Sequence, residues 1–251
     1  MKRIIFINFF LVIIIVLFLE VIIRIFNIAS LQGYDKQAFY FENGIISGKP
    51  NNSFKVYGVK SKTDKNGFRI PINNFSFFDD KNSILVLGDS VTFGVGVEEK
   101  NSFIGILRDK TKKNNIYNTA ISGHNIESYL YILKKNHKKF NNEINQVLIF
   151  LCLNDVVPYQ GVVFERELEE NKNNPIKKIT KNTFALKLNI FLREKSALFV
   201  LIKGLVTNPI ERHFDFMKAL YEDEKNLLEF EKILNQMTKF MDKNNLKYKY
   251  V

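Results

Sequence analysis

From Ser83 onward, the chain alternates between short apolar runs and stretches whose apolar residues recur with helical spacing. The apolar runs are typical of strands that are covered on both faces, and they lie at Ile84 to Leu87, Asn115 to Thr119 and Val147 to Leu151. The intervening stretches follow the capping candidates Asn101 or Ser102 and Asn125, and their apolar faces comprise Phe103, Ile106 and Leu107, then Ile126, Tyr129, Leu130 and Leu133. This alternation predicts an α/β domain with a parallel sheet and right-handed crossovers, in which the second and third strands flank the first.

The pattern changes after the third strand. A long polar insertion, centred on Asn171 to Pro175, precedes two helical stretches. We predict one helix over Phe184 to Leu205, and then a longer one whose buried stripe comprises Leu227, Phe230, Leu234, Met237 and Met241. Asn244 and Asn245 end that helix, and Leu246 to Val251 begins a fourth strand. The sequence stops inside this strand, so we expect the domain to be incomplete at its C-terminus.

The N-terminus carries a different signal. Ile4 to Ile23 is almost entirely apolar, and a helix of about 20 residues is long enough to cross a bilayer. A cleaved signal peptide is the alternative, but it would have a shorter apolar region and a small-x-small cleavage site. We therefore predict a single-pass anchor over residues 4–26, a membrane-proximal segment with a few short strands over 27–80, and the main domain over 81–251. Lys2 and Arg3 favour a cytoplasmic N-terminus and an extracytoplasmic domain.

Composition narrows the classes of partner. The 251 residues carry 37 Lys and Arg against 26 Asp and Glu, a net charge of +11. The lysines are scattered among asparagines and form no sustained patch, so we expect no nucleic-acid partner. Gly88 to Gly96 completes neither a phosphate loop nor a dinucleotide fingerprint, and we expect no cofactor and no metal. The single cysteine, Cys152, cannot form an intramolecular disulfide, and we expect it to be a small buried residue.

Small polar residues follow each of the first three strands: Ser90, Gly123 and Asn154. Ligands bind open α/β sheets beyond the carboxyl ends of the strands, so these residues are expected to share one site. Ser90 offers a hydroxyl nucleophile. Its backbone N–H, that of Gly123 and the Asn154 amide could stabilise the oxyanion of an acyl-transfer intermediate. We predict supporting roles for Asp89 and Asp155, which would hydrogen-bond the loops, and for Thr92 and Gly94, which would shape the Ser90 turn.

These motifs also resemble a known family. Gly88-Asp89-Ser90-x-Thr92-x-Gly94 is similar to the first block of the SGNH (GDSL-type) esterases and acyltransferases, Asn118 to Gly123 to the second, and Asn154-Asp155 to the third. Glu20-x-x-x-Arg24 and Asn66-Gly67-Phe68-Arg69 resemble membrane-anchored bacterial members. The resemblance implies a three-layer, flavodoxin-like parallel sheet, with Ser90 as the nucleophile and Ser90, Gly123 and Asn154 as the oxyanion hole.

The chain departs from the family at two places. Cys152 stands where the third block normally has glycine, and the Asp-x-x-His block that supplies the family's base is absent. His124 is the nearest alternative base, whereas His137 and His213 are expected on helix surfaces. Two functions stay open: a membrane-anchored esterase or O-acyltransferase acting on acylated cell-envelope carbohydrate, or a truncated or degenerate domain that at most binds carbohydrate. Without a base, we expect residues 1–251 alone to be essentially inactive.

Overall fold

The computed structural model describes residues 2–73, 75–77, 82–111, 114–140, 143–156 and 183–251. Its main sheet has seven strands in the order β3-β4-β5-β7-β6-β8-β9. Their bounds are β3 Ser53–Val56, β4 Val59–Thr63, β5 Arg69–Ile70, β6 Asn82–Leu87, β7 Asn114–Asn118, β8 Ile144–Ile149 and β9 Lys247–Tyr250. A separate hairpin pairs β1 (Phe39–Glu42) with β2 (Ile45–Gly48) through a turn at Asn43 and Gly44.

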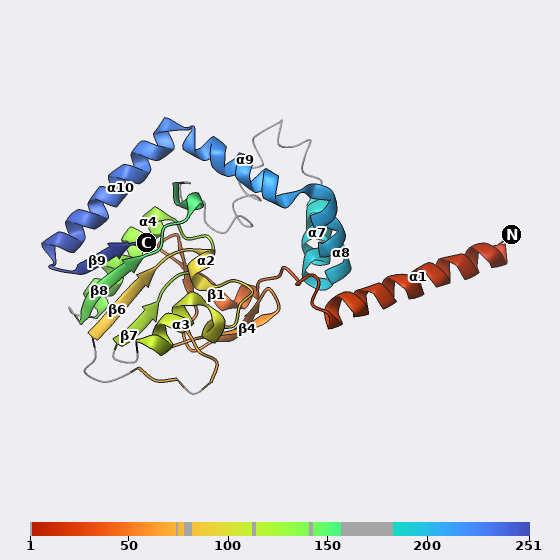
Figure 1. The fold of residues 1–251 in the computed structure, drawn as a ribbon, viewed down its shortest axis with the longest axis horizontal. Coiled ribbons are helices and arrows are strands. Elements are labelled where there is room, and N and C mark those ends of the chain that lie inside the picture. The colour runs from red at the N-terminus through yellow and green to blue at the C-terminus, as the bar shows by residue number, and fades with distance from the viewer. Residues whose placement is uncertain (1, 74, 78–81, 112–113, 141–142, 157–182) are drawn as a thin grey trace.

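Four neighbouring strands, β7, β6, β8 and β9, form the parallel part of the sheet (Figure 1). The predicted arrangement is confirmed here, because β7 and β8 flank β6. The whole sheet is mixed, however, since β5 pairs antiparallel with β7 and continues into the antiparallel strands β4 and β3. These extra strands come from the segment before residue 80, so the sheet crosses the predicted domain boundary, and the division into domains remains a prediction.

The helices of the described chain are α1 Lys2–Ile25, α2 Ser90–Phe93, α3 Phe103–Lys110, α4 Ile126–Lys139, α7 Thr183–Lys195, α8 Ala197–Thr207, α9 Pro209–Tyr221 and α10 Glu224–Lys243. Short 3-10 turns lie at Lys36–Ala38, Glu99–Asn101 and Leu153–Val156, the last labelled η3. The prediction of one helix over Phe184 to Leu205 is wrong in one respect, because the structure has two helices, α7 and α8, in this range. Ser196 lies between α7 and α8, and its hydroxyl accepts a hydrogen bond from the Phe199 N–H, which starts a new helix there.

The two faces of β6 explain the layered fold. Leu85 and Leu87 face a core shared with α4 and α10, whereas Ile84 and Val86 face Ile104 of α3 on the other side. Strand side chains alternate between faces, so an uninterrupted apolar run requires a cover on both. The α/β fold with helices on both sides of the sheet is therefore confirmed. The predicted stripe of α10 is confirmed for Met237 and Met241, which are fully buried, and for Phe230 and Leu234, which pack against this core, whereas Leu227 is half-buried.

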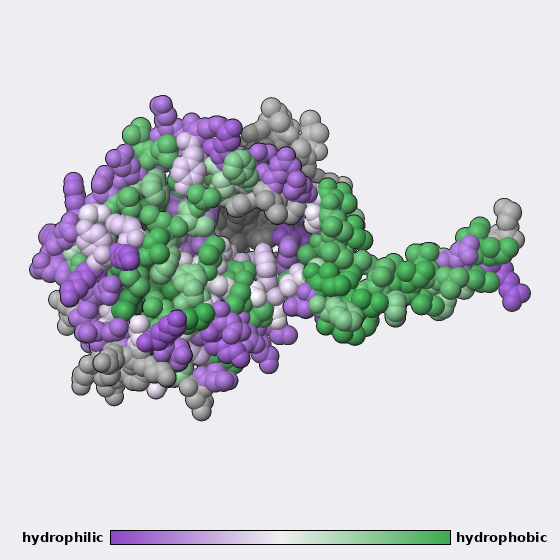
Figure 2. Space-filling model, in the orientation of Figure 1, coloured by the Kyte–Doolittle hydropathy of each residue, from purple (hydrophilic) through white to green (hydrophobic). Residues whose placement is uncertain are grey.

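Helix α1 projects away from the folded body (Figure 1), and apolar side chains cover most of its length, with hydrophilic ones at its N-terminal end (Figure 2). Its span Arg3–Ile25 has a mean hydropathy of 3.1 and is long and apolar enough to cross a membrane. A signal sequence would pass the same test of length and composition.

Candidate active site

Ser90 begins helix α2, directly after the carboxyl end of β6. Asp89 is the N-cap: its Oδ1 accepts a hydrogen bond of 2.9 Å from the Val91 N–H, and its Oδ2 accepts one of 3.3 Å from the Ser90 hydroxyl. Asp89 is buried, whereas Ser90 is half-buried. The turn therefore holds a reachable hydroxyl at a helix N-terminus, where the backbone N–H groups favour developing negative charge.

Close packing fixes the conformation of this turn. A Cβ on Gly88 would lie 2.2 Å from the Thr92 hydroxyl, so only glycine fits beneath the buried Thr92 side chain. Gly94 ends α2 in the left-handed conformation, and its N–H donates to the Ser90 carbonyl at 3.0 Å. Thr92 thus packs against the turn that presents Ser90, and Gly94 ends it.

The second loop follows β7 and contains Gly123. Its φ of +91° favours glycine, while the space around a Cβ would be open, so backbone conformation rather than crowding accounts for this residue. The predicted cap at Asn125 is confirmed as a reciprocal capping box with Ser128. At the start of the loop, the fully buried Asn118 amide donates to the Thr92 carbonyl at 3.4 Å, which joins the second loop to the Ser90 turn.

The third loop follows β8 and carries Asn154 and Asp155 in η3. Asp155 is fully buried and accepts two hydrogen bonds of 2.8 Å, from the Tyr129 hydroxyl and from the Cys152 N–H. The pKa of Asp155 is raised to about 7, mainly by burial and also by the charge of Asp89, although both hydrogen bonds act to lower it. Asp155 therefore anchors the loop to helix α4 from inside, and the neighbouring Asn154 remains half-buried.

The three loops begin side by side. The Thr119 N–H donates to the Val86 carbonyl at 3.1 Å, and the Phe150 N–H donates to the Leu87 carbonyl at 3.0 Å. The charge of Asp89 also acts across them, since it helps to raise the pKa of Asp155 and that of Cys152. Cys152 is half-buried, with burial as the main reason for its raised pKa. Ser90, Gly123 and Asn154 thus belong to loops that leave the same edge of the sheet.

Of the described histidines, His124 follows Gly123 in the second loop and hydrogen-bonds the backbone of Gly88, whereas His137 lies on α4. His124 is buried, and its Nε2 lies 2.8 Å from the Ile46 carbonyl. Burial lowers the pKa of His124 to about 4, so its imidazole is neutral at pH 7. His137 is half-buried rather than on the surface, because it packs against Phe240 and lies 3.1 Å from the Asn244 side chain. The side chain of His213 lies outside the described residues.

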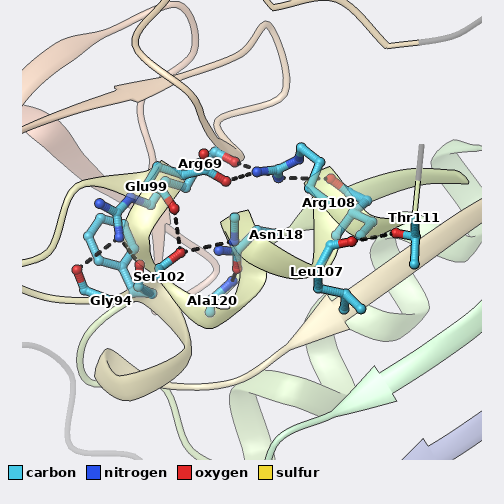
Figure 3. Close-up of polar contacts among 12 residues, drawn as sticks. Arg69, Gly94, Glu99, Ser102, Leu107, Arg108, Thr111, Asn118 and Ala120 are labelled. Atoms are coloured by element: carbon cyan, nitrogen blue, oxygen red, sulfur yellow. Dashed lines mark hydrogen bonds and ion pairs between the residues drawn. The ribbon is translucent and has the colours of Figure 1, made fainter.

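A buried arginine supports the Ser90 turn from behind. The Arg69 guanidinium donates to the carbonyls of Phe93, Gly94 and Val97, the bond to Gly94 being 2.9 Å long, and stacks 4.5 Å from the centre of the Phe93 ring. Figure 3 shows this side chain directed at the end of α2. Burial lowers the pKa of Arg69 to about 10, which leaves it charged at pH 7. Three carbonyls at and just beyond the end of the Ser90 turn thus converge on one cation.

A second arginine extends this cluster. Arg108 of α3 forms a buried ion pair with Glu99, and its guanidinium donates to the carbonyls of Ile116, at 3.1 Å, and of Arg69, at 3.4 Å (Figure 3). Helix α3 and strand β7 are thereby tied to the strand that carries Arg69. The sequence singles out Arg69 only through the Asn66 to Arg69 resemblance, and no pattern in it points to Arg108.

We expect Arg69→Met to destabilise the protein by about 3 kcal/mol. The substitution keeps an apolar stem of similar length but leaves buried carbonyls without their donor. Urea denaturation of the detergent-solubilised chain measures the free energy of unfolding. Lys60→Met is the matched control, because Lys60 is exposed on β4 of the same sheet and its loss should change stability by less than about 0.5 kcal/mol. Equal stabilities for the two variants would contradict the supporting role of Arg69.

The segment before residue 80 also reaches the site, which the sequence patterns did not indicate. The Tyr34 hydroxyl donates to the Ser122 hydroxyl at 2.8 Å, beside Gly123. The pKa of Tyr34 is raised to about 12, mainly by burial and in small part by the charge of Asp89. Phe39 and Phe54 pack in the same cluster as Phe93 of α2. This aromatic cluster therefore forms one wall beside the Ser90 turn.

Comparison with known proteins gives structural likeness alone. No protein-family profile matches the chain, and no curated protein sequence is significantly similar to it. Among solved structures, the chain is similar to TesA, with 23% identity over 30% of this chain and 43% of that one and a TM-score of 0.28. The psychrotrophic esterase EstA from a Pseudoalteromonas species is 17% identical over 68% of this chain and 78% of its own, with a TM-score of 0.29.

A lipolytic G-D-S-L family protein from Veillonella parvula is 11% identical over 66% of this chain and 75% of its own, with a TM-score of 0.27. TM-scores this low carry no argument about the substrate. The likeness of this chain to a known family therefore rests on its motifs and on its strand order. In both respects, this chain resembles the SGNH (GDSL-type) hydrolases.

Proposed function

We propose that this protein is a membrane-anchored serine esterase or O-acyltransferase with Ser90 as its nucleophile. One observation carries the proposal: Ser90 begins a capped helical turn at the carboxyl end of β6, and the loops of Gly123 and Asn154 leave the flanking strands at the same edge. This is where an open α/β sheet binds its ligands. The anchor is α1, and the basic residues at its start favour an extracytoplasmic domain.

The chemistry follows from the groups at this edge. The Ser90 oxygen attacks the carbonyl carbon of an ester, and the carbonyl oxygen becomes an oxyanion. The N–H groups of Ser90 and Gly123 and the Asn154 amide are its proposed donors. Collapse of the tetrahedral intermediate expels the alcohol and leaves an acyl group on Ser90. Water then accepts this group in hydrolysis, and a second hydroxyl accepts it in transfer.

Proton removal from Ser90 requires a base. Among the described residues, the hydroxyl has the Asp89 carboxylate as its partner, and the neutral His124 bonds to the backbones of Ile46 and Gly88 rather than to the hydroxyl. The family resemblance assigns this role to the histidine of an Asp-x-x-His block. A domain that binds acylated carbohydrate without turnover is the second candidate function, because the described contact of the Ser90 hydroxyl is with the Asp89 carboxylate.

Active-site labelling distinguishes the two candidates. The detergent-solubilised chain is incubated with a fluorophosphonate, with and without added imidazole as an external base, and modified peptides are located by mass spectrometry. The esterase proposal predicts phosphonylation at Ser90 that imidazole accelerates. Labelling spread over exposed serines, with Ser90 unmodified under both conditions, would leave only the binding function.

The substrate is proposed from location rather than from the site. An anchored extracytoplasmic domain faces the cell envelope, where ester-linked acyl groups occur on carbohydrate. Release of acetate from acetylated oligosaccharides, with acetylated peptides as the comparison, tests this choice of substrate.

A further inference from the structure

We propose that helices α7 and α8 form a hairpin that lies on the membrane surface, with its apolar face against lipid and its turn fixed to the end of α1. The inference rests on the proposed role of α1 as an anchor. It adds a second membrane contact, which would hold the domain in one orientation over the bilayer.

The first step is the bond between α1 and the turn of the hairpin. The Glu20 carboxylate accepts hydrogen bonds from the Ser196 hydroxyl at 2.8 Å and from the N–H groups of Ala197 and Leu198 at 2.8 and 2.9 Å. These N–H groups belong to the first turn of α8, whose unpaired donors favour an anion. A residue of α1 therefore caps a helix that begins 177 positions later in the chain.

Arg24 completes the contact from the next turn of α1. Its Nε pairs with Glu20 at 2.6 Å, and its Nη2 donates to the Lys195 carbonyl at the end of α7, also at 2.6 Å. The Glu20 carboxylate thus binds the N-terminus of α8, and the Arg24 guanidinium binds the C-terminus of α7. Both contacts are the ones that the helix dipoles favour. Ile23 and Ala197 are both buried at this junction, although α1 is otherwise exposed along almost all of its length.

Further bonds make the hairpin one unit. Lys203 of α8 donates to the Asn189 side chain of α7 at 2.6 Å. Arg193 and Gln32 exchange two bonds, from the Arg193 Nε to the Gln32 side chain at 2.8 Å and from the Gln32 N–H to the Arg193 carbonyl at 2.9 Å. The chain that leaves α1 therefore holds the hairpin as well, and α7, α8 and the end of α1 are expected to move together.

The length of α1 sets the height of this junction. Arg3 and Glu20 are separated by about 26 Å along a helix that rises 1.5 Å per residue, and the hydrocarbon core is about 30 Å thick. With Arg3 at one boundary, Glu20 and Arg24 reach the other, where water and headgroups tolerate their charges. The 11 residues of α8 span about 17 Å and are too short to cross the bilayer, so the hairpin would lie along its surface.

The face of the hairpin suits that position. Among the described residues, apolar side chains stay exposed on both helices: Leu188, Phe191, Ile202, Leu205 and Val206, the last two at 78%. Figure 2 shows an apolar surface over α7 and α8 that continues onto α1. Soluble proteins rarely expose such a patch, and exposed Lys187 and Lys195 on α7 are suited to anionic headgroups. Continuity with the spanning helix makes lipid the expected occupant.

Tryptophan fluorescence tests the contact directly, because the chain contains no tryptophan. The full chain is reconstituted into vesicles whose lipids are brominated either near the glycerol end or near the bilayer centre. Leu205→Trp is the probe on the hairpin, Phe10→Trp reports the middle of α1, and Leu228→Trp, exposed on α10, is the matched control. We expect Leu205→Trp to be quenched strongly by the shallow bromines, Phe10→Trp by the deep ones, and Leu228→Trp by neither.

The outcomes separate the two proposals. If Phe10→Trp is quenched but Leu205→Trp behaves like the control, the anchor stands and the proposed contact of the hairpin with the membrane is overturned. Blue-shifted but unquenched emission from Leu205→Trp would place protein over the hairpin, such as a second copy of the chain, and would also overturn it. An unquenched Phe10→Trp overturns the anchor and the inference together.

Glu20→Ala tests the junction itself. In a chain that also carries Leu205→Trp, we expect it to reduce the shallow quenching by at least half, because α8 loses its anionic cap and its bond to α1. Quenching of Phe10→Trp should be unaffected by Glu20→Ala, which shows that the anchor remains inserted. Unchanged quenching of Leu205→Trp would show that Glu20 does not hold the hairpin at the membrane.

Discussion

Ser90→Ala is expected to abolish the ester hydrolysis that the protein contributes in the presence of imidazole. The substitution removes the single oxygen proposed to attack the ester and leaves the Asp89 cap on the Val91 N–H intact. Hydrolysis of p-nitrophenyl acetate by the detergent-solubilised chain is measured over a range of imidazole concentrations. The rate with Ser90→Ala should fall to that of imidazole alone, a loss of essentially the whole protein-dependent rate.

Two controls make this result specific. Ser76→Ala removes the hydroxyl of an exposed serine outside the three loops and should retain the parent rate. His124→Ala should also retain Ser90 labelling, because the neutral imidazole of His124 bonds to the Ile46 carbonyl rather than to the nucleophile. A protein-dependent rate that survives in Ser90→Ala would contradict the nucleophile assignment, and one that disappears in His124→Ala would identify His124 as the base.

The central fold was predictable because its signals are local. Ile84 to Leu87 must be covered on both faces, and this alone requires helices on two sides of the sheet. The caps at Ser102 and Asn125 act within three residues of their helices and are confirmed at both positions. Strand order followed from placing the three polar loops at one edge. The covered strand and the two caps depend on residues that are close in sequence, and the strand order on three motifs that each lie within one loop.

The parts that the sequence did not reveal depend on distant partners. Arg69 lies 24 to 28 residues before the carbonyls it binds, and an isolated arginine gives no sign of being buried. Tyr34 and Ser122 are 88 residues apart. The antiparallel strands join the parallel strands through a single pair of residues, Arg69 and Asn118. No hydrophobic pattern in the sequence indicates this pairing. Such long-range contacts extend the site beyond the three loops that carry its motifs.

The break between α7 and α8 has the same origin. Apolar spacing continues through Ser196, and helical propensity alone allows an uninterrupted helix. Ser196 becomes a cap because Glu20 lies against it from 176 residues earlier. The Glu20 carboxylate accepts hydrogen bonds from the Ser196 hydroxyl and from the next two backbone N–H groups. Glu20 and Arg24 were visible in the sequence as a pair at the end of the span, but the helix ends they bind were not.

Asn154→Ala is expected to lower kcat by roughly 10²- to 10³-fold with little change in KM, because an oxyanion donor acts mainly on the transition state. The side chain is half-buried, and Asp155 anchors its loop through Tyr129 and the Cys152 N–H, so the loop should keep its conformation without the amide. Kinetics of p-nitrophenyl acetate hydrolysis with imidazole measure both parameters.

Asn154→Asp is the matched control for that result. An ionised aspartate has nearly the same shape as asparagine but only accepts hydrogen bonds, and its charge would repel an oxyanion. A donor role therefore predicts that Asn154→Asp is at least as impaired as Asn154→Ala, whereas a role in packing predicts that it retains activity. Full kcat in Asn154→Asp, or a loss that appears only in KM, would remove Asn154 from the oxyanion hole and leave the backbone N–H groups of Ser90 and Gly123 as the proposed donors.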